Sequence, residues 1–324
     1  MPTHSAPEAA PDGAIADGRR TVAVLGGTGF LGQAFCARFV RQGWRVLAVA
    51  RNTSGYSGPG EPLSLDLTRI TAAELTAVLT EHQVTDVINA AGGMWGLTEE
   101  QMVGANVTLV ETLIAAIAAA PGRPRLIQMG SVHEYGLLPI GISATEDYLP
   151  QPSTAYGKLK LEATEAILAA ASRGEIDALV LRYGNVTGAG QPGHSLLGII
   201  AAQLGAAARS GAVAELTLAP LTALRDFVDL EDCADAALAA VIAPVSGLVV
   251  NIGRGSATVT RDLVEALIAV SGVPTEITNS PATAEPETEW QQLAIGRAEE
   301  LLGWTPQREL KGSIADLWQA YPGK

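Results

Sequence analysis

Tyr156 and Lys160 are the residues of this sequence whose types and spacing most directly indicate chemistry. Their spacing, four positions apart, places a phenol and an ammonium group on one face of a helix. Ser131 comes earlier, at the end of an apolar run typical of a β-strand. A phenol can donate a proton to a carbonyl oxygen, and a hydroxyl can hold that oxygen by a second hydrogen bond. We therefore predict that Ser131, Tyr156 and Lys160 are catalytic residues that act on a carbonyl group.

Lys160 has a second predicted role, because a phenol that gives up its proton must tolerate the charge that remains. The pKa of a free phenol is about 10. An ammonium group ~4 Å away stabilises the phenolate by on the order of 4 kcal/mol at an effective dielectric constant of ~20. Lys160 is also placed to hold the ribose of a cofactor. Lys158 lies two residues from Tyr156 and should point elsewhere.

A glycine-rich loop predicts what supplies the hydride. Gly26, Gly29 and Gly32 have the spacing G-x-x-G-x-x-G between a strand pattern at 21–25 and a helix pattern at 30–42. Backbone N–H groups at such a helix start can face a pyrophosphate, whereas the alternative is a plain tight turn. We predict a dinucleotide cofactor whose contacts in this loop are Gly26, Thr28, Gly29, Phe30 and Leu31.

The end of the second strand pattern, at 45–50, indicates which dinucleotide is used. An acidic residue there would bond the ribose 2′-hydroxyl, but the chain has Arg51 and Asn52. A guanidinium suits a 2′-phosphate, so NADPH (NADP+) is predicted over NADH. The alternative is that Arg51 is a solvated surface residue. Asp66 and Leu67 follow the third strand pattern and are candidates for contact with the adenine, although Asp66 has the equal alternative of an ordinary turn residue.

Strand and helix patterns alternate from about residue 19 to 185, which predicts a parallel sheet covered on both faces. We expect an α/β fold of the Rossmann type, a doubly wound parallel sheet with a smaller, irregular α/β C-terminal lobe. The predicted organisation is a disordered tail at 1–18 and a dinucleotide-binding domain at 19–185 with a return segment at about 226–252. A substrate-binding lobe would be formed by 186–225 and 253–324.

Composition limits the partners. The net charge of −13 argues against nucleic acid and against an anionic membrane surface. The two cysteines, Cys36 and Cys233, are too few for a disulfide framework, and no metal is expected. The longest apolar run, at 109–120, contains Glu111 and Thr112, so we predict no membrane span. The start of the chain lacks the features of a signal peptide, and a cytoplasmic protein is expected.

Nearly the whole chain after the tail resembles the extended short-chain dehydrogenase/reductase family, which includes nucleotide-sugar epimerases, dehydratases and reductases. The motifs that carry the resemblance are the glycine loop, Asn89-Ala90-Ala91-Gly92, Asn106, Ser131 to Gly136, Pro152-x-x-x-Tyr156-x-x-x-Lys160, Leu181-Arg182-Tyr183-Gly184-Asn185, Arg225-Asp226-Phe227-Val228 and Leu302-Gly303-Trp304-Thr305-Pro306. The resemblance implies that further cofactor contacts come from Ala90, Ala91, Gly92 and Tyr183. It also implies a nucleotide-sugar substrate and a homodimer formed through helices 106–120 and 156–171.

Substrate contacts are likewise implied by the resemblance. Asn185 would meet the sugar nucleotide, and Arg225 would pair with the diphosphate unless it forms an ion pair with Asp226 or Asp229. His133 would line the sugar pocket or be an ordinary loop histidine. Trp95 would form a wall of the substrate site or serve packing.

The segment from Gly130 to Gly136 looks most like the dTDP-4-keto-6-deoxyhexose 4-ketoreductases, which finish activated deoxysugars for natural products such as antibiotics. Dehydratases of the family place an Asp-Glu pair after the catalytic Ser or Thr, where this chain has Val132 and His133. The stretch 282–291 is acidic and lacks the arginine that many relatives carry there for the second phosphate.

These features imply NADPH-dependent reduction of a C4 ketone, with Tyr156 as the proton donor. An alternative is an NAD-dependent epimerase or dehydratase of the same family. A less favoured one is a non-catalytic dinucleotide-binding regulator, because the tyrosine and the lysine are both present.

Overall fold

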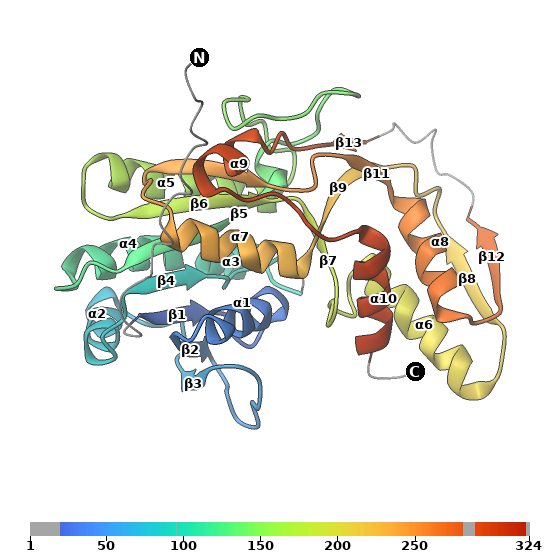
Figure 1. Cartoon of the computed structure of the whole chain (residues 1–324), viewed down its shortest axis with the longest axis horizontal. Coiled ribbons are helices and arrows are strands. Elements are labelled where there is room, and N and C mark those ends of the chain that lie inside the picture. Colours follow the sequence, from blue (N-terminus) through green and yellow to red (C-terminus); the bar gives the residue numbers. More distant parts are fainter. Residues whose placement is uncertain (1–19, 95, 281–288, 322–324) are drawn as a thin grey trace, which may run out of the picture.

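The computed structural model describes residues 20–94, 96–280 and 289–321. Its centre is a parallel seven-stranded sheet with the strand order β10-β6-β5-β4-β1-β2-β3 (Figure 1). The strands are β1 (Thr21–Leu25), β2 (Arg45–Ala50), β3 (Glu61–Ser64), β4 (Asp86–Asn89), β5 (Arg125–Ser131), β6 (Ala178–Tyr183) and β10 (Leu248–Ile252). The order reverses beside β1, which places a ligand crevice at the carboxyl ends of the strands.

Helices cover both faces of this sheet. Successive residues of one strand pack into two different cores, since Val22 and Val24 of β1 join one cluster while Ala23 and Leu25 join the other. The first cluster includes residues of α1 (Phe30–Arg41), α7 (Leu230–Ile242) and α9 (Gly296–Leu302). The second includes residues of α2 (Ala72–Glu81), α4 (Leu109–Ala119) and α5 (Ala155–Ser172). The predicted doubly wound Rossmann-type fold is therefore confirmed.

A second group of elements, at the right of Figure 1, stands beside the carboxyl ends of the central strands. A small sheet contains β7 (Asn185–Thr187), β9 (Leu224–Asp229), β11 (Ala257–Val259) and β13 (Trp290–Gln291), and β8 (Ala214–Leu218) pairs with β12 (Thr275–Asn279). Helices α6 (Leu196–Ser210), α8 (Thr260–Ser271) and α10 (Leu310–Ala320) share a separate apolar core with β8 and with Phe227 of β9. The domain boundaries drawn from the sequence remain predictions.

One helix corrects the prediction about apolar length. α3 (Glu99–Val103), a π-helical turn (Gly104–Thr108) and α4 form one continuous helix, Glu99–Ala119, which is long and apolar enough by length and composition to cross a membrane. Its most apolar window of 18 residues has a mean hydropathy of 1.7, and 39% of that window is buried inside the molecule. The apolar segment is shorter in the sequence pattern because Gly104 and Asn106 interrupt it. In the structure both residues lie in the π-helical turn, so the helix continues without a break.

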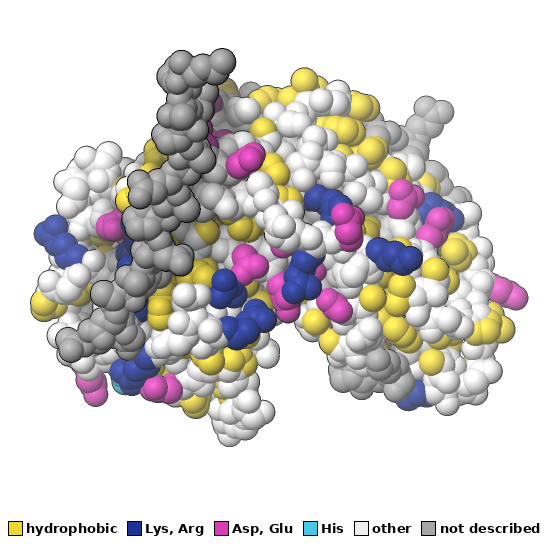
Figure 2. Space-filling model, viewed as in Figure 1, with side chains coloured by type: hydrophobic (Ala, Val, Ile, Leu, Met, Phe, Trp, Pro, Cys, Tyr) yellow, Lys and Arg dark blue, Asp and Glu magenta, His cyan; other side chains and the backbone are white. Residues whose placement is uncertain are grey.

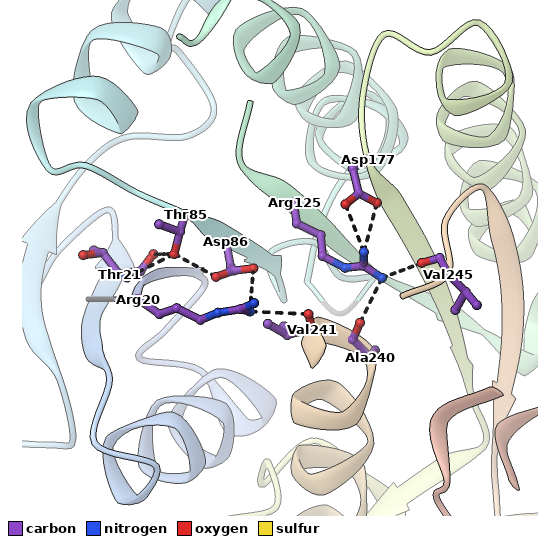
Figure 3. A network of polar contacts seen from close by, with 9 residues as sticks. All are labelled: Arg20, Thr21, Thr85, Asp86, Arg125, Asp177, Ala240, Val241 and Val245. Carbon is purple, nitrogen blue, oxygen red and sulfur yellow. Dashed lines mark hydrogen bonds and ion pairs between the residues drawn. The ribbon is translucent and has the colours of Figure 1, made fainter. Parts of the chain in front are cut away.

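A polar network ties together the amino ends of the strands (Figure 3). Arg20 bonds Asp86 at the start of β4, and Thr85 bonds both Asp86 and the backbone of Thr21. Arg125, at the start of β5, pairs with Asp177 at 2.9 Å and also donates to the carbonyls of Ala240 and Val245. The network therefore fastens α7 and its following turn to the sheet at the edge opposite the predicted catalytic residues.

Candidate active site

The glycine loop after β1 forms a tight backbone turn at the start of α1. Gly26 has φ +74°, and Gly29 is the N-cap of the helix. A Cβ atom on Gly32 would collide with the carbonyl of Gly26, so only glycine permits this approach. The turn leaves the first N–H groups of α1 facing the crevice, where a pyrophosphate would bind.

The residues predicted to contact the adenosine part of the cofactor lie after the ends of two neighbouring strands, β2 and β3. Arg51 is exposed, and its carbonyl accepts a hydrogen bond from Ser64. Asn52 caps a small turn by accepting the N–H of Ser54. Bonds from Thr68 hold the pKa of Asp66 below its ordinary value, and the nearby Arg51 charge adds to this shift. The predicted group is therefore assembled, with Asp66 in a turn and Leu67 packed on the sheet core.

The segment after β4, with Ala90, Ala91 and Gly92, lies against the π-turn of the long helix. Gly92 has φ +119°, and a Cβ there would meet Asn106 Oδ1 at 2.9 Å. Asn106 donates to the carbonyls of Gly93 and Met102, while its Oδ1 is buried without a hydrogen-bond partner among the described residues. Asn106 thus holds the backbone beneath the predicted cofactor position.

Ser131, Tyr156 and Lys160 are brought together as predicted. Ser131 ends β5 and shares a hydrogen bond with the Tyr156 phenol. Lys160 is buried on the same face of α5, with Nζ 5.8 Å from the centre of the Tyr156 ring. This arrangement can hold a carbonyl oxygen with two hydroxyl groups and one adjacent cation.

The pKa values differ from the expectation that Lys160 eases ionisation of the phenol. Burial, with a contribution from the Glu134 charge, raises the pKa of Tyr156 to about 12, and only the bond to Ser131 opposes this. Burial lowers the pKa of Lys160 to about 8. The Lys160 ammonium donates to the carbonyl of Met129 at 2.9 Å rather than to the phenol. In this state Tyr156 is a neutral proton donor at pH 7.

Two glycines allow α5 to approach the end of β5 closely. A side chain on Gly157 would collide with the carbonyl of His133, and one on Gly136, at φ +77°, would collide with that of Gln151. Thr154 caps α5 by accepting the N–H of Gly157. The close approach brings Tyr156, in the first turn of α5, to Ser131.

A buried charged pair next to Ser131 and α5 was not predicted from the sequence. Glu134 is fully buried, accepts the N–H of Ser131 at 2.8 Å and pairs with Arg182 of β6 at 2.6 Å. Thr164 of α5 donates to the same carboxylate at 2.9 Å. The available signal was an arginine inside the otherwise apolar strand 178–183, because a buried charge requires a partner.

Two of the predicted substrate residues lie near Tyr156. His133 is beside its ring, and Arg225 is close enough to His133 to act on it electrostatically. The rings of His133 and Tyr156 meet edge to face at 6.0 Å, and burial followed by the Arg225 charge lowers the pKa of His133. Arg225 pairs with Glu289 and bonds Gln291, so the expected alternative partners, Asp226 and Asp229, are not its partners. Asp226 instead accepts three backbone N–H groups, and Asp229 caps α7.

Asn185 lies beside the strand of Arg225, whereas the Tyr183 side chain is buried in the core. Asn185 donates to the carbonyl of Asp226 at 3.3 Å, beside the Arg225 strand. The Tyr183 ring packs in the core against Phe35, and its hydroxyl donates to the carbonyl of Cys233. This packing does not favour contact between the Tyr183 side chain and the nicotinamide. The predicted cofactor contact of Tyr183 stays a prediction. Trp95 lies outside the described residues.

A cavity of about 310 Å³ lies beside the start of α1, between that helix, the loop at Gly188 and the N-terminus of α7. It is lined by Phe30 and Gln33 on one side and by Asp229 and Asp316 on the other. Figure 2 shows the face hollowed between the two parts of the molecule, with acidic and basic side chains mixed above the hollow. The glycine cradle, the uncovered start of α1 and the unpartnered Asn106 Oδ1 together fit a dinucleotide at this edge of the sheet.

The fold and this site define an NAD(P)-dependent enzyme of the short-chain dehydrogenase/reductase type. Residues 22–253 match the model of the NAD dependent epimerase/dehydratase family. The chain belongs to that family.

Three individual proteins illustrate what the chain is similar to within this family and fold. The chain is 54% identical over 301 residues to a dTDP-6-deoxy-L-talose 4-dehydrogenase (NAD(P)(+)) of Kitasatospora kifunensis, an alignment that covers 92% of this chain and 95% of that protein. It superimposes on MoeE5 in complex with UDP-glucuronic acid and NAD with a TM-score of 0.79 and 25% identity, covering 92% and 98% of the two chains. RMD from Pseudomonas aeruginosa complexed with NADPH shares the fold, with a TM-score of 0.78 and 21% identity over 94% of this chain and 100% of that one.

Proposed function

We propose that this protein reduces the C4 ketone of a dTDP-activated 4-keto-6-deoxyhexose with NADPH. The observation that carries the proposal is the grouping of Ser131, Tyr156 and Lys160 beside Val132 and His133, where a dehydratase would have an acid pair. The relative at 54% identity, which is named as acting at position 4 of a dTDP-6-deoxy sugar, supports this substrate class. The overall reaction converts a carbonyl to a secondary alcohol.

The residues of the chain divide the work of the reaction. When bound, the nicotinamide supplies the hydride. Tyr156 donates its proton to the carbonyl oxygen, and Ser131 holds that oxygen by a hydrogen bond, which lowers the cost of the charge that develops there. Lys160 stabilises the phenolate that remains and holds the cofactor ribose. A proton from solvent then restores the phenol before the next turnover.

Arg51 supports the choice of NADPH. Its exposed guanidinium lies at the end of β2, where a ribose 2′-phosphate would meet it and where Asp66 is the nearby carboxylate. The similar dehydrogenase is named for both NAD and NADP, so we propose a preference and not an exclusive use of NADPH.

Arg225 is the proposed contact for the diphosphate. Glu289 occupies its guanidinium, and Gln291 holds the same side chain. A diphosphate carries more negative charge than one carboxylate, so we propose that it displaces Glu289 from Arg225 when the substrate binds. His133 and Asn185 would then line the sugar side of the pocket.

The central experiment incubates the purified protein with NADPH and a dTDP-4-keto-6-deoxyhexose. We expect loss of the reduced-nicotinamide absorbance in step with formation of the 4-hydroxy sugar, and a loss roughly 10²–10⁴-fold slower with the Tyr156→Phe variant. Failure to oxidise NADPH with any sugar of this class would reject the proposal.

The same experiment tests the epimerase alternative. Several similar proteins are named UDP-glucose 4-epimerase, among them that of Rhizobium leguminosarum bv. trifolii, which is 26% identical over 323 residues and is covered to 96%. An epimerase would retain NAD through purification and interconvert two UDP-sugars without net turnover of cofactor.

We also propose that the protein is a cytoplasmic homodimer. Thr108, Glu111 and Ala115 are exposed on the continuous helix Glu99–Ala119, and only 39% of its most apolar window is buried inside the molecule. A carboxylate on this helix is costly in lipid and acceptable in a subunit contact. Sedimentation at micromolar concentration should give twice the mass of one chain, and a monomer would reject the proposal.

A further inference from the structure

We propose that Glu134 is a positioning residue for the catalytic pair. Its buried carboxylate fixes Ser131 against α5 and supplies the negative charge that keeps Lys160 protonated during the reaction. This inference rests on the proposed function, because it assigns Glu134 a role in the same chemistry.

The carboxylate of Glu134 joins three elements, β5, β6 and α5. Glu134 Oε1 accepts the N–H of Ser131 at 2.8 Å, at the end of β5. Its Oε2 accepts Thr164 Oγ1 at 2.9 Å and Arg182 Nε at 2.6 Å. Thr164 lies one helical turn after Lys160 on the same buried face of α5. A change at Glu134 therefore moves both the serine and the helix that carries Tyr156 and Lys160.

The backbone around Glu134 leaves room for this carboxylate and little else. A Cβ atom on Gly130 would lie 2.7 Å from Glu134 Oε1, so a side chain there would displace it. Arg182 is fixed on its other side, since its guanidinium carbon lies 4.6 Å from the centre of the Tyr135 ring. Tyr135 is in turn bonded to Asn251 at 2.8 Å. The carboxylate is therefore held without freedom to turn away.

The charge of Glu134 acts on the same residues. Burial raises the pKa of Glu134, while the Arg182 guanidinium opposes this shift and favours the ionised carboxylate. The ionisable groups around the carboxylate are His133 and Tyr135 on its own segment, Arg182 on β6, and Tyr156 and Lys160 on α5. Burial lowers the pKa of Lys160, and the charge of Glu134 opposes that shift. The same charge raises the pKa of Tyr156, which keeps the phenol neutral until it donates. Without the Glu134 charge, burial of Lys160 would act unopposed, and the ammonium would lose its proton closer to pH 7.

Three variants separate charge from shape. Glu134→Gln removes the charge and keeps the side-chain volume, while Glu134→Asp keeps the charge and shortens the reach. Because the first variant leaves Arg182 buried without its partner, the double variant Glu134→Gln with Arg182→Met provides a form with neither charge. Glu165→Gln, an exposed glutamate beside Thr164 on α5, is the matched control.

The readout is the titration of Lys160 by NMR in protein that carries ¹³C-labelled lysine. The chain has four lysines, and the Lys160 signal is assigned as the one missing from Lys160→Met. We expect its midpoint to fall in Glu134→Gln by on the order of one pH unit, from the loss of one nearby charge. The double variant also lacks the Glu134 charge, so its midpoint should fall as well, while Glu134→Asp and the control should stay near the wild type. Equal midpoints in the wild type, the glutamine variant and the double variant would overturn the proposal.

Kinetics gives the second readout. In ketone reduction, we expect kcat of Glu134→Gln to fall at least about tenfold, with its alkaline limb moved to lower pH, while KM for NADPH changes little. A purely structural role predicts the opposite order, with the aspartate variant more damaged than the glutamine variant and no shift of the limb. The NMR titration needs no substrate, so it still tests Glu134 if the proposed reaction is not found.

Discussion

At the scale of single residues, the proposed catalytic pair, Tyr156 and Lys160, is costly to the fold. Lys160 is 5% exposed, and its ammonium has one neutral acceptor, the carbonyl of Met129. Tyr156 stays protonated because burial opposes the phenolate. Both groups hold the protonation states that proton donation to a ketone requires, at the expense of stability.

Lys160→Met should make the folded protein more stable while abolishing reduction. The pKa of Lys160 is about 8 in the fold against 10.5 ordinarily, so the native state disfavours the charged form. This penalty is fully present below pH 8 and disappears as the pH rises from 8 to 10.5. We expect a gain of roughly 2 kcal/mol at pH 7, after allowing for the lost bond to Met129. Thermal unfolding at several pH values checks it, and a gain that does not shrink between pH 8 and 10.5 would contradict it.

Tyr156→Phe should lower kcat for reduction roughly 10²–10⁴-fold, because it removes the proton donor. The substitution removes only the hydroxyl group and keeps the ring. Binding of NADPH, followed by nicotinamide fluorescence, should change little. A variant that keeps more than half of the wild-type kcat would show that another group donates the proton.

Arg51→Ala should raise KM for NADPH by about tenfold or more and leave KM for NADH nearly unchanged. The reason is that only NADPH carries a phosphate for this exposed guanidinium to bind. Steady-state assays with NADPH and NADH measure the ratio of the two KM values. Arg69→Ala, which removes an exposed arginine in the turn that begins at Asp66, is the control. Equal effects on both cofactors would assign Arg51 to the surface.

At the scale of elements, the sequence predicts the strands and helices around the catalytic residues well, because buried parallel strands and glycine loops leave clear local patterns. Thr21–Leu25 and Arg45–Ala50 lie where they were expected. The long helix begins at Glu99 and not near Asn106, because a π-turn depends on tertiary packing around Gly92. The pairing of Glu134 with Arg182 joins residues far apart in the chain, which no local pattern reports.

Gly157→Ala should separate α5 from the end of β5. Its Cβ would collide with the carbonyl of His133, so the helix must shift and lengthen the Ser131–Tyr156 contact. We expect kcat to fall about tenfold or more, since a shift of about 1 Å in a catalytic group has effects of this size. Gly174→Ala, in the open turn after α5, tests whether any loss comes from general strain. An active Gly157→Ala variant with unchanged stability would contradict the close approach.

At the scale of the whole molecule, the amino and carboxyl edges of the central sheet have different tasks. The carboxyl edge carries the site and its buried charges, whereas the amino edge is fastened by the network of Arg20, Asp86, Arg125 and Asp177 (Figure 3). Arg125 is the member that reaches the turn after α7 through the carbonyl of Val245. Stability at one edge can therefore be changed without touching the chemistry at the other.

Arg125→Ala should destabilise the fold by about 1–3 kcal/mol and leave kcat per folded molecule unchanged. The variant leaves two carbonyls without their donor and an aspartate without its partner. Urea unfolding measures the change. Arg173→Ala, which breaks an exposed pair with Glu175, should show no measurable loss. Equal stability in both variants would contradict the role of the network.

The central claim, that Tyr156 serves net reduction of a C4 ketone, is tested most directly by the fate of a labelled hydride. NADPH with deuterium at the transferred position of its nicotinamide should yield a sugar product with one deuterium at C4, formed in equal amount to NADP+ and absent with Tyr156→Phe. Mass spectrometry and proton NMR of the product measure this. A sugar recovered without deuterium, with its stereochemistry changed and no NADP+ formed, would contradict the account.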